Sequence, residues 1–274
     1  ARSLSAKARW IEAETSVGMV RDLFDALESR TRAQHLDRRT TLKGKTRVLK
    51  VDGKKALPIS DEARATVTAF MHQFAASQPN PDFYRVIDVA RRIAGTGSLG
   101  VDRYAILVEG KGSPDGNYLL DLKEALPSSV TPHVRTPQPK WHSEAQRVVE
   151  IQRRNQAVSQ AFLHAVDFNQ RSYVLRSLQP SEDRVALSAW DDKLPRLEAV
   201  INSMAELSAW GQLRSGGRQK SAIADELIAF GNRKDWQLPL IDLATQCEAQ
   251  VNADWKAYCE AYDGGAFNLP VQKS

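Results

Sequence analysis

The sequence is poor in cysteine and has no long apolar run. Its 274 residues include two cysteines, Cys247 and Cys259, which fall in one predicted helix. Twelve residues at about 1.5 Å each place them roughly 18 Å apart, which is too far for a disulfide. They also lack the paired spacing of a zinc site, so we expect plain thiols in a reducing compartment.

No apolar segment approaches the roughly 20 residues that a membrane span requires. The longest candidate, Tyr104 to Val108, has the length of a strand. The first residues, Ala1 to Leu4, lack the apolar core of a signal peptide. With 42% hydrophobic and 26% charged residues, the composition is that of an ordinary globular protein. These features predict a cytoplasmic protein with no membrane partner.

The positive charge is local. The net charge is +5, but the segment 28–55 holds ten Lys or Arg against three acids, so the remainder is close to neutral at −2. Such a segment could contact nucleic acid. It lacks interleaved aromatic residues and any binding motif, and charge runs are usually solvated surface. We therefore do not expect a nucleic-acid partner, although a binding protein that uses this segment is the alternative to the reading below.

The pattern of apolar residues and turns predicts an α+β fold. Residues 46–59 contain Asp52-Gly53, a strong hairpin signal, and Ser60 is the expected N-cap of the helix that follows. The predicted helices are 5–31, 61–75, 143–166, 194–213, 221–230 and 238–262. The predicted strands are 86–93, 101–108, 118–123 and 171–178. We expect three segments: 1–82, with helices and a basic hairpin; 83–180, a small antiparallel sheet with one packed helix; and 181–274, a helical region.

A glycine motif, Gly95-x-Gly97-x-x-Gly100, lies between two predicted strands. A dinucleotide-binding loop runs from strand to helix, whereas the glycine loop of a kinase turns from strand to strand and covers the nucleotide phosphates. Glycine lets the backbone approach phosphate, and Ser98 adds a hydroxyl donor at the tip. The motif alone is equally consistent with a tight hairpin that needs glycine for positive φ.

Lys123 ends the third strand after the glycines, where an ammonium group can pair with nucleotide phosphates. The helix that begins at Ser143 offers Glu150 to orient this lysine, with Gln146 one turn earlier on the same face. Taken singly, Lys123 is more often a solvated lysine at a strand end, and Glu150 a solvated helix acid. The ordered set of loop, lysine and helix is more specific than any member.

Over about residues 5–262 the chain resembles the C-terminal part of the bacterial family called domain of unknown function 2252. Members of that family look like circularly permuted relatives of protein kinases. The resemblance is carried by Ile-Ala-Gly-Thr-Gly-Ser-Leu-Gly at 93–100, Leu-Asp-Leu-Lys-Glu-Ala at 120–125, Gln-Arg-Val-Val-Glu-Ile-Gln-Arg at 146–153 and Tyr-Val-Leu-Arg-Ser-Leu at 173–178. Shorter matches are Lys-Ala-Arg-Trp at 7–10 and Leu-Arg-Ser-Gly at 213–216.

The resemblance implies a kinase-like fold that binds ATP with Mg²⁺ for phosphoryl transfer. The expected nucleotide-binding residues are Gly95, Gly97, Ser98, Gly100, Lys123, Glu150, Gln146, Arg176 and Leu178, with residues 176–178 near the adenine.

In the family, a Gly-Asp-x-His-x-x-Asn segment and an Asp-Phe-Asp segment precede the matched part and resemble the catalytic loop and metal-binding aspartate of kinases. Neither occurs in residues 1–274. The nearest imitation, at 164–169, has too short a spacing between Asp167 and Asn169 and is predicted to be a helix-ending turn. We therefore expect the metal ligands outside this chain, which is a fragment, is completed by a second chain, or is non-catalytic.

Overall fold

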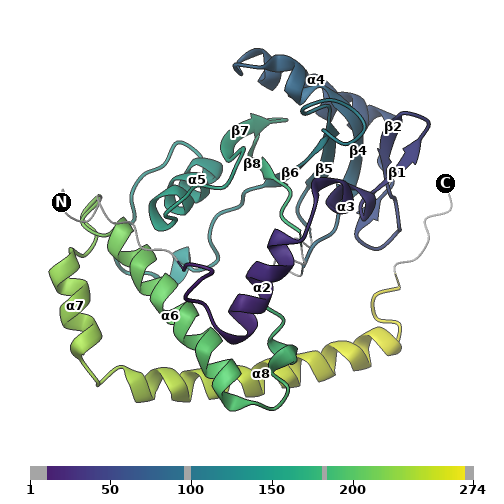
Figure 1. Ribbon diagram of the computed structural model, residues 1–274. Coiled ribbons are helices and arrows are strands. Elements are labelled where there is room, and N and C mark those ends of the chain that lie inside the picture. Colours follow the sequence, from purple (N-terminus) through teal and green to yellow (C-terminus); the bar gives the residue numbers. More distant parts are fainter. Residues whose placement is uncertain (1–10, 96–99, 181–183, 269–274) are drawn as a thin grey trace. The chain divides into compact units, whose positions relative to one another are not determined.

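The computed structural model describes residues 11–95, 100–180 and 184–268. The chain mixes helices with an antiparallel sheet and divides into two compact units, residues 1–215 and 216–274. The helices of the first unit are α2 (Gly18–Glu28), α3 (Arg32–Asp37), α4 (Asp61–Ala76), α5 (Glu144–Asn155) and α6 (Leu194–Ser215), with short 3₁₀ turns at Pro81–Tyr84, Thr131–His133 and Leu187–Trp190 (Figure 1).

The main sheet has the order β3-β4-β5-β6-β8-β7, and every neighbouring pair is antiparallel. Its strands are β3 (Ala56–Leu57), β4 (Val86–Arg92), β5 (Arg103–Val108), β6 (Tyr118–Glu124), β7 (His164–Phe168) and β8 (Arg171–Ser177). The predicted run of strand, glycines, strand and strand is confirmed, because β4 pairs with β5 and β5 pairs with β6.

The two faces of the sheet bury different layers. Alternate side chains point to opposite faces. One set, including Ile106, Leu120 and Leu122, packs with Val67 and Met71 of α4 in the largest apolar cluster. The other set, including Ala105, Leu107 and Leu119, packs with Leu36 of α3 and Leu49. The sheet therefore has α4 on one face, and α3 with the basic segment on the other.

The helix predicted over 143–166 ends earlier than expected. Ser143 caps it as the sequence indicates, accepting the N–H of Gln146, but α5 stops at Asn155. Residues 164–168 form β7, which pairs with β8. Asn169 and Gln170, both at positive φ, make the turn between these strands. The turn at Asn169 was predicted correctly, but it joins two strands rather than a helix and a strand, so the helix-ending interpretation is wrong.

The hairpin predicted at Asp52-Gly53 is also wrong. The hairpin of this region lies earlier, where β1 (Thr40–Lys43) pairs with β2 (Thr46–Leu49). The Asp52 carboxylate instead accepts the backbone N–H groups of Lys54, Lys55 and Ala56 at 2.7–2.9 Å. This turn leads the chain into β3, which pairs with β4.

Of the helix predicted over 5–31, the described residues show only α2, because residues 11–17 form a turn and not a helix; residues 5–10 lie outside the described part. A second helix, α3, follows the predicted range. Thr31 separates the two helices because its hydroxyl accepts the N–H of Gln34 and starts α3 with a capping box. Met19 and Val20 of α2 pack against Val200 of α6.

The second unit contains α7 (Ala224–Asn232) and α8 (Gln237–Asp263), as the sequence predicts. Trp236, between them, stacks on Phe230 with ring centroids 5.3 Å apart. Cys247 and Cys259 are free thiols on α8. Across the described residues, no helix combines the length and apolarity of a membrane span.

Candidate functional site

A basic cavity of about 780 Å³ opens on the sheet face that carries α3 and the basic segment. Its volume lies within the range of small-molecule sites, which is roughly 300–1,000 Å³. Ten Lys or Arg side chains and two carboxylates line it, a net charge of +8. Its apolar lining includes Leu49, Ala105, Leu119 and Leu178. The cavity therefore combines apolar surface with a large excess of positive charge.

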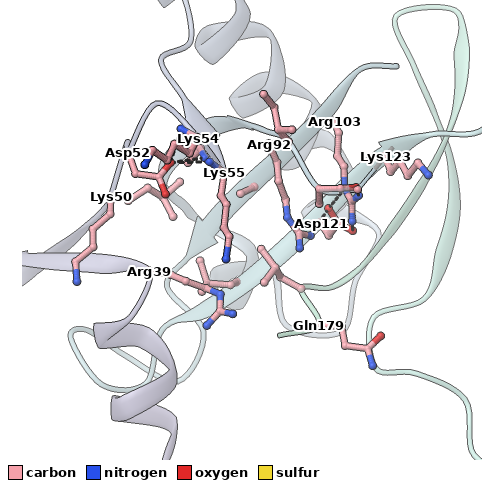
Figure 2. A pocket seen from close by; sticks show the side chains of 18 of the residues that line it. Arg39, Lys50, Asp52, Lys54, Lys55, Arg92, Arg103, Asp121, Lys123 and Gln179 are labelled. Atoms are coloured by element: carbon pink, nitrogen blue, oxygen red, sulfur yellow. Dashed lines mark hydrogen bonds and ion pairs between the residues drawn. The ribbon is translucent and has the colours of Figure 1, made fainter. Parts of the chain in front are cut away.

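The floor of the cavity is a buried carboxylate held by arginines from three strands. Asp121 of β6 is 1% exposed, and Arg103 of β5 donates to both of its oxygens at 2.7 Å. Arg92 of β4 lies 2.8 Å from Oδ1, and Arg176 of β8 lies 3.4 Å from Oδ2. Figure 2 shows Arg92 and Arg103 converging on Asp121.

Register explains this convergence. Arg103 is paired with Lys123, Ala105 with Asp121, and Asp121 with Arg176, and cross-strand partners share a face. Burial alone would raise the pKa of Asp121, but the hydrogen bonds of Arg103 and the charges of Arg92, Arg103 and Arg176 outweigh it, so the pKa lies below its ordinary value. The carboxylate is ionised and fixes the arginines around it.

Arg92 is the least satisfied member of the floor. Its Nη1 is buried next to Asp121, yet it makes no hydrogen bond of suitable geometry among the described residues. Burial lowers the pKa of Arg92, as do the charges of Arg103 and Arg176, whereas Asp121 raises it. A buried donor without an acceptor costs free energy. An anion placed over Arg92 would add a better-aligned acceptor to the Asp121 carboxylate that lies 2.8 Å away.

The glycine motif begins after β4, and its first residue, Gly95, lines this cavity. Arg103 Nη1 donates to the carbonyl of Ala94 at 3.2 Å and so fixes the start of the connection between β4 and β5. At the other end, Arg171 bridges Asp102 and the buried carboxylate of Glu124. Gly95 and Gly100 have φ of +71° and +77°, the region that favours glycine. Gly97 and Ser98 lie outside the described residues.

Lys123 lines the cavity from the third strand, as the sequence predicts. It lies on the same face as Asp121, two residues earlier. Partial burial lowers the pKa of its ammonium group, and the charges of Arg103 and Arg176 lower it further, while Asp121 opposes them. Lys123 therefore occupies a position where an anion would be favoured.

Glu150 and Gln146 do not line the cavity. Glu150 pairs with Arg153 on the same helix at 3.3 Å, and Gln146 Oε1 accepts the backbone N–H of His142 at the start of α5. Within the described part of the chain, no ion pair joins Glu150 to Lys123. Four of the nine predicted residues, Gly95, Lys123, Arg176 and Leu178, meet in the cavity; the nucleotide-binding roles of all nine stay predictions.

Sequence reasoning missed the basic segment as part of this site. Arg38, Arg39, Lys50, Lys54 and Lys55 all line the cavity. The local charge of +7 over residues 28–55 was the available signal, but it was interpreted as solvated surface. What brings this segment to the cavity is a long-range strand pairing, since Ala56 pairs with Arg92 and Ile93 N–H donates to the carbonyl of Lys55 at 2.9 Å.

A smaller, more apolar cavity of about 320 Å³ shares Leu119 and Leu178 with the basic cavity. Leu27, Leu36 and Tyr118 contribute to its lining. Arg30 and Arg32 also line the smaller cavity, so the two leucines separate two cavities that both carry arginine side chains, near the end of β8.

The carboxylates of the basic cavity do not fit a metal site. Asp121 is enclosed by arginines, and Asp52 is occupied by three backbone N–H groups. In the described ranges there is no group of three or more His, Cys, Asp or Glu that could hold a metal ion. A magnesium ion with a nucleotide would need ligands other than these two side chains.

One protein-family model matches residues 3–261, nearly the whole chain; its description is "Uncharacterized protein conserved in bacteria (DUF2252)". No curated protein and no solved structure matches the chain.

Proposed function

The chain belongs to this family of uncharacterised bacterial proteins, and we propose that residues 83–180 form a kinase-like small lobe that binds a nucleotide through its phosphates. The observation that carries the proposal is the basic cavity, where a strand-to-strand glycine connection, a lysine on the next strand and an arginine-lined floor meet. Kinases place their glycine loop and phosphate-binding lysine on successive strands in the same order.

In this proposal the phosphates lie over the floor, next to Lys123 and the glycine connection of Gly95, Gly97, Ser98 and Gly100. Arg92 and Arg176 offer guanidinium groups that Asp121 holds in place, and arginine donors bind phosphate with directional, charge-assisted hydrogen bonds. The base lies against the apolar wall formed by Leu119 and Leu178, the residues shared with the smaller cavity.

We further propose that the chain is the small-lobe part of an ATP-dependent phosphotransferase. Phosphoryl transfer requires a group that positions the acceptor and metal ions that neutralise charge. Because the cavity's two carboxylates are already occupied, those groups would come from a segment or second chain outside residues 1–274. Mg²⁺, when bound with the nucleotide, would supply charge neutralisation. The residues of this chain would bind and orient the phosphates.

Isothermal titration of ATP into the chain tests the proposal. We expect saturable binding that weakens about tenfold in Lys123→Gln, since one charge-assisted contact is worth about 1.5–3 kcal/mol. Lys111→Gln is the matched control, because Lys111 is exposed in the β5–β6 turn and does not line the cavity. Equal ATP affinity in both variants, or no binding by the parent chain, would contradict the proposal.

The alternative function, a non-catalytic protein that binds nucleic acid through its basic segment, predicts a different pattern. The structure separates this segment's cations: Arg38 and Arg39 line the cavity, whereas Lys43 and Lys45 lie exposed at the β1–β2 turn. A nucleic-acid backbone would contact both pairs and bind with steep salt dependence. A small anion would depend on Arg38 and Arg39 alone, so neutralising each pair separately distinguishes the two functions.

A further inference from the structure

Nine of the ten cations of the basic cavity form two groups on different elements, and the tenth, Arg184, lies in the segment that follows β8. The floor group, Arg92, Arg103, Lys123 and Arg176, comes from β4, β5, β6 and β8. The rim group comes from the segment between α3 and β3 and consists of Arg38, Arg39, Lys50, Lys54 and Lys55. In Figure 2, Lys54 and Lys55 lie beside Asp52 on one side of the cavity, and Arg103 and Lys123 lie on the other.

The backbone of the rim turn is held by contacts that differ from those of the floor. Asp52 fixes the backbone of Lys54 and Lys55 through their N–H groups, at 2.9 and 2.7 Å. The hydrogen bond between Ile93 N–H and the carbonyl of Lys55 joins this turn to β4. The two exposed side chains make no ion pair within the described parts of the chain, so their charges face the cavity mouth from a fixed backbone.

The charge of the cavity exceeds what one nucleotide neutralises. A nucleoside triphosphate carries about four negative charges at neutral pH, since each internal phosphate contributes one and the terminal phosphate up to two. The cavity's net charge is +8 with its two carboxylates included. The floor alone, four cations and Asp121, supplies +3 of this. The rim, five cations and Asp52, supplies a further +4, so each group carries enough positive charge for an anionic group of its own.

We propose that the rim is a second anion subsite, which binds the phosphate group of a small phosphorylated molecule while the floor binds the first anion. This proposal deepens the proposed function, and its statement about the substrate rests on that function. If the floor holds the nucleotide, the rim selects a substrate that is itself phosphorylated. The existence of two separable subsites does not depend on the identity of the first ligand.

Titration with inorganic pyrophosphate, followed by calorimetry, tests the two subsites directly. We expect the parent chain to bind two equivalents. The double variant Lys54→Gln/Lys55→Gln loses the rim equivalent, by about tenfold or more in affinity, and keeps the other. Arg176→Gln does the reverse. The matched control is Lys43→Gln/Lys45→Gln, which removes the same charge from the same segment at the exposed β1–β2 turn and should leave both equivalents unchanged.

A single equivalent of pyrophosphate that both cavity variants weaken equally would overturn the inference, as would a loss in the Lys43/Lys45 control as large as in the rim variant. A second titration, with ADP present at saturation, separates this inference from the proposed function. Under both proposals ADP displaces the floor equivalent and leaves the rim equivalent. If ADP displaces neither, nucleotide binding fails while the two subsites stand.

Discussion

Replacing Asp121 by Asn tests the central structural feature of the cavity, the carboxylate that holds three arginines. The side chain is 1% exposed and Arg103 is 8% exposed, so the substitution leaves buried guanidinium groups without their counter-charge. It also turns an amide NH₂ towards donors that need an acceptor. Breaking a buried pair on one side typically costs about 3–5 kcal/mol, and we expect Asp121→Asn to lower the free energy of unfolding by about that amount.

Urea denaturation followed by circular dichroism measures this loss. With a slope of about 1–3 kcal/mol per molar urea, the midpoint should fall by at least about 1 M. Asp25→Asn is the control, because its pair with Arg21 is a surface i,i+4 contact whose side chains are 54% and 42% exposed, and such pairs contribute less than about 1 kcal/mol. A loss in Asp121→Asn no larger than in the control would refute the account of the floor.

Two further properties of this variant follow from the same charges. Because the folded pKa of Asp121 lies below its ordinary value of 3.8, its contribution is present above that value and is lost as the pH falls below it. The difference between parent and variant should therefore shrink in acid. Pyrophosphate should also stabilise the variant more than the parent, since it replaces the missing anion; equal stabilisation would contradict this role.

The remaining predictions concern the rim turn, one glycine and activity. The Asp52 carboxyl should titrate near 2 by NMR, because the backbone N–H groups of Ala56, Lys54 and Lys55 lower its pKa from 3.8 to about 2. The stabilisation that this carboxylate gives the turn is then present above pH 3.8 and is lost as the pH falls through 2. A titration midpoint near 3.8 would show that the turn does not form. Gly110→Ala should destabilise the chain by about 1–3 kcal/mol in thermal unfolding, since its φ is +65° and a Cβ would lie 2.3 Å from the carbonyl oxygen of Gly116. Gly53→Ala is the control and should cost less, because Gly53 has a φ of +70° but no atom within 4 Å of an added Cβ. Equal losses would show that backbone strain alone, and not the close approach to Gly116, sets the cost at Gly110. The purified chain should not turn over ATP with Mg²⁺ at a kinase-like rate unless a segment that carries a catalytic loop and metal ligands is added, and robust turnover that Lys123→Ala abolishes would place the catalytic groups within this chain.

The strands and helices that were predicted correctly from the sequence are those bounded by clear local signals, such as N-cap serines and turn glycines. Ser60 and Ser143 mark the starts of α4 and α5, and the glycines at 95–100 separate β4 from β5. The errors lie where the local sequence favours one element but long-range strand pairing imposes another. Residues 156–163 hold no glycine or proline to end α5, so a helix was extended into β7, although the alternation of burial along 164–168 is that of a strand.

The site was predictable only in part, for the same reason. Lys123 could be proposed because the glycine spacing and the order of strands are visible in the sequence, whereas Arg176 was proposed only from the family resemblance. The rim could not be proposed, because Lys54 and Lys55 reach the cavity through the pairing of β3 with β4 across about 35 residues of chain. Asp121 was missed because its partners lie on other strands. Only the register of the sheet places Arg103 and Arg176 beside it, and the sequence alone does not give that register.

The measurement that tests the central claim most directly is the affinity of the chain for adenosine, AMP, ADP and ATP, titrated at one ionic strength. If the cavity binds nucleotides through their phosphates, affinity should rise with each phosphate, adenosine should bind weakest, and Lys123→Gln should flatten the series while Lys111→Gln leaves it unchanged. An affinity that does not depend on phosphate number, or a series that Lys123→Gln leaves intact, would contradict the account.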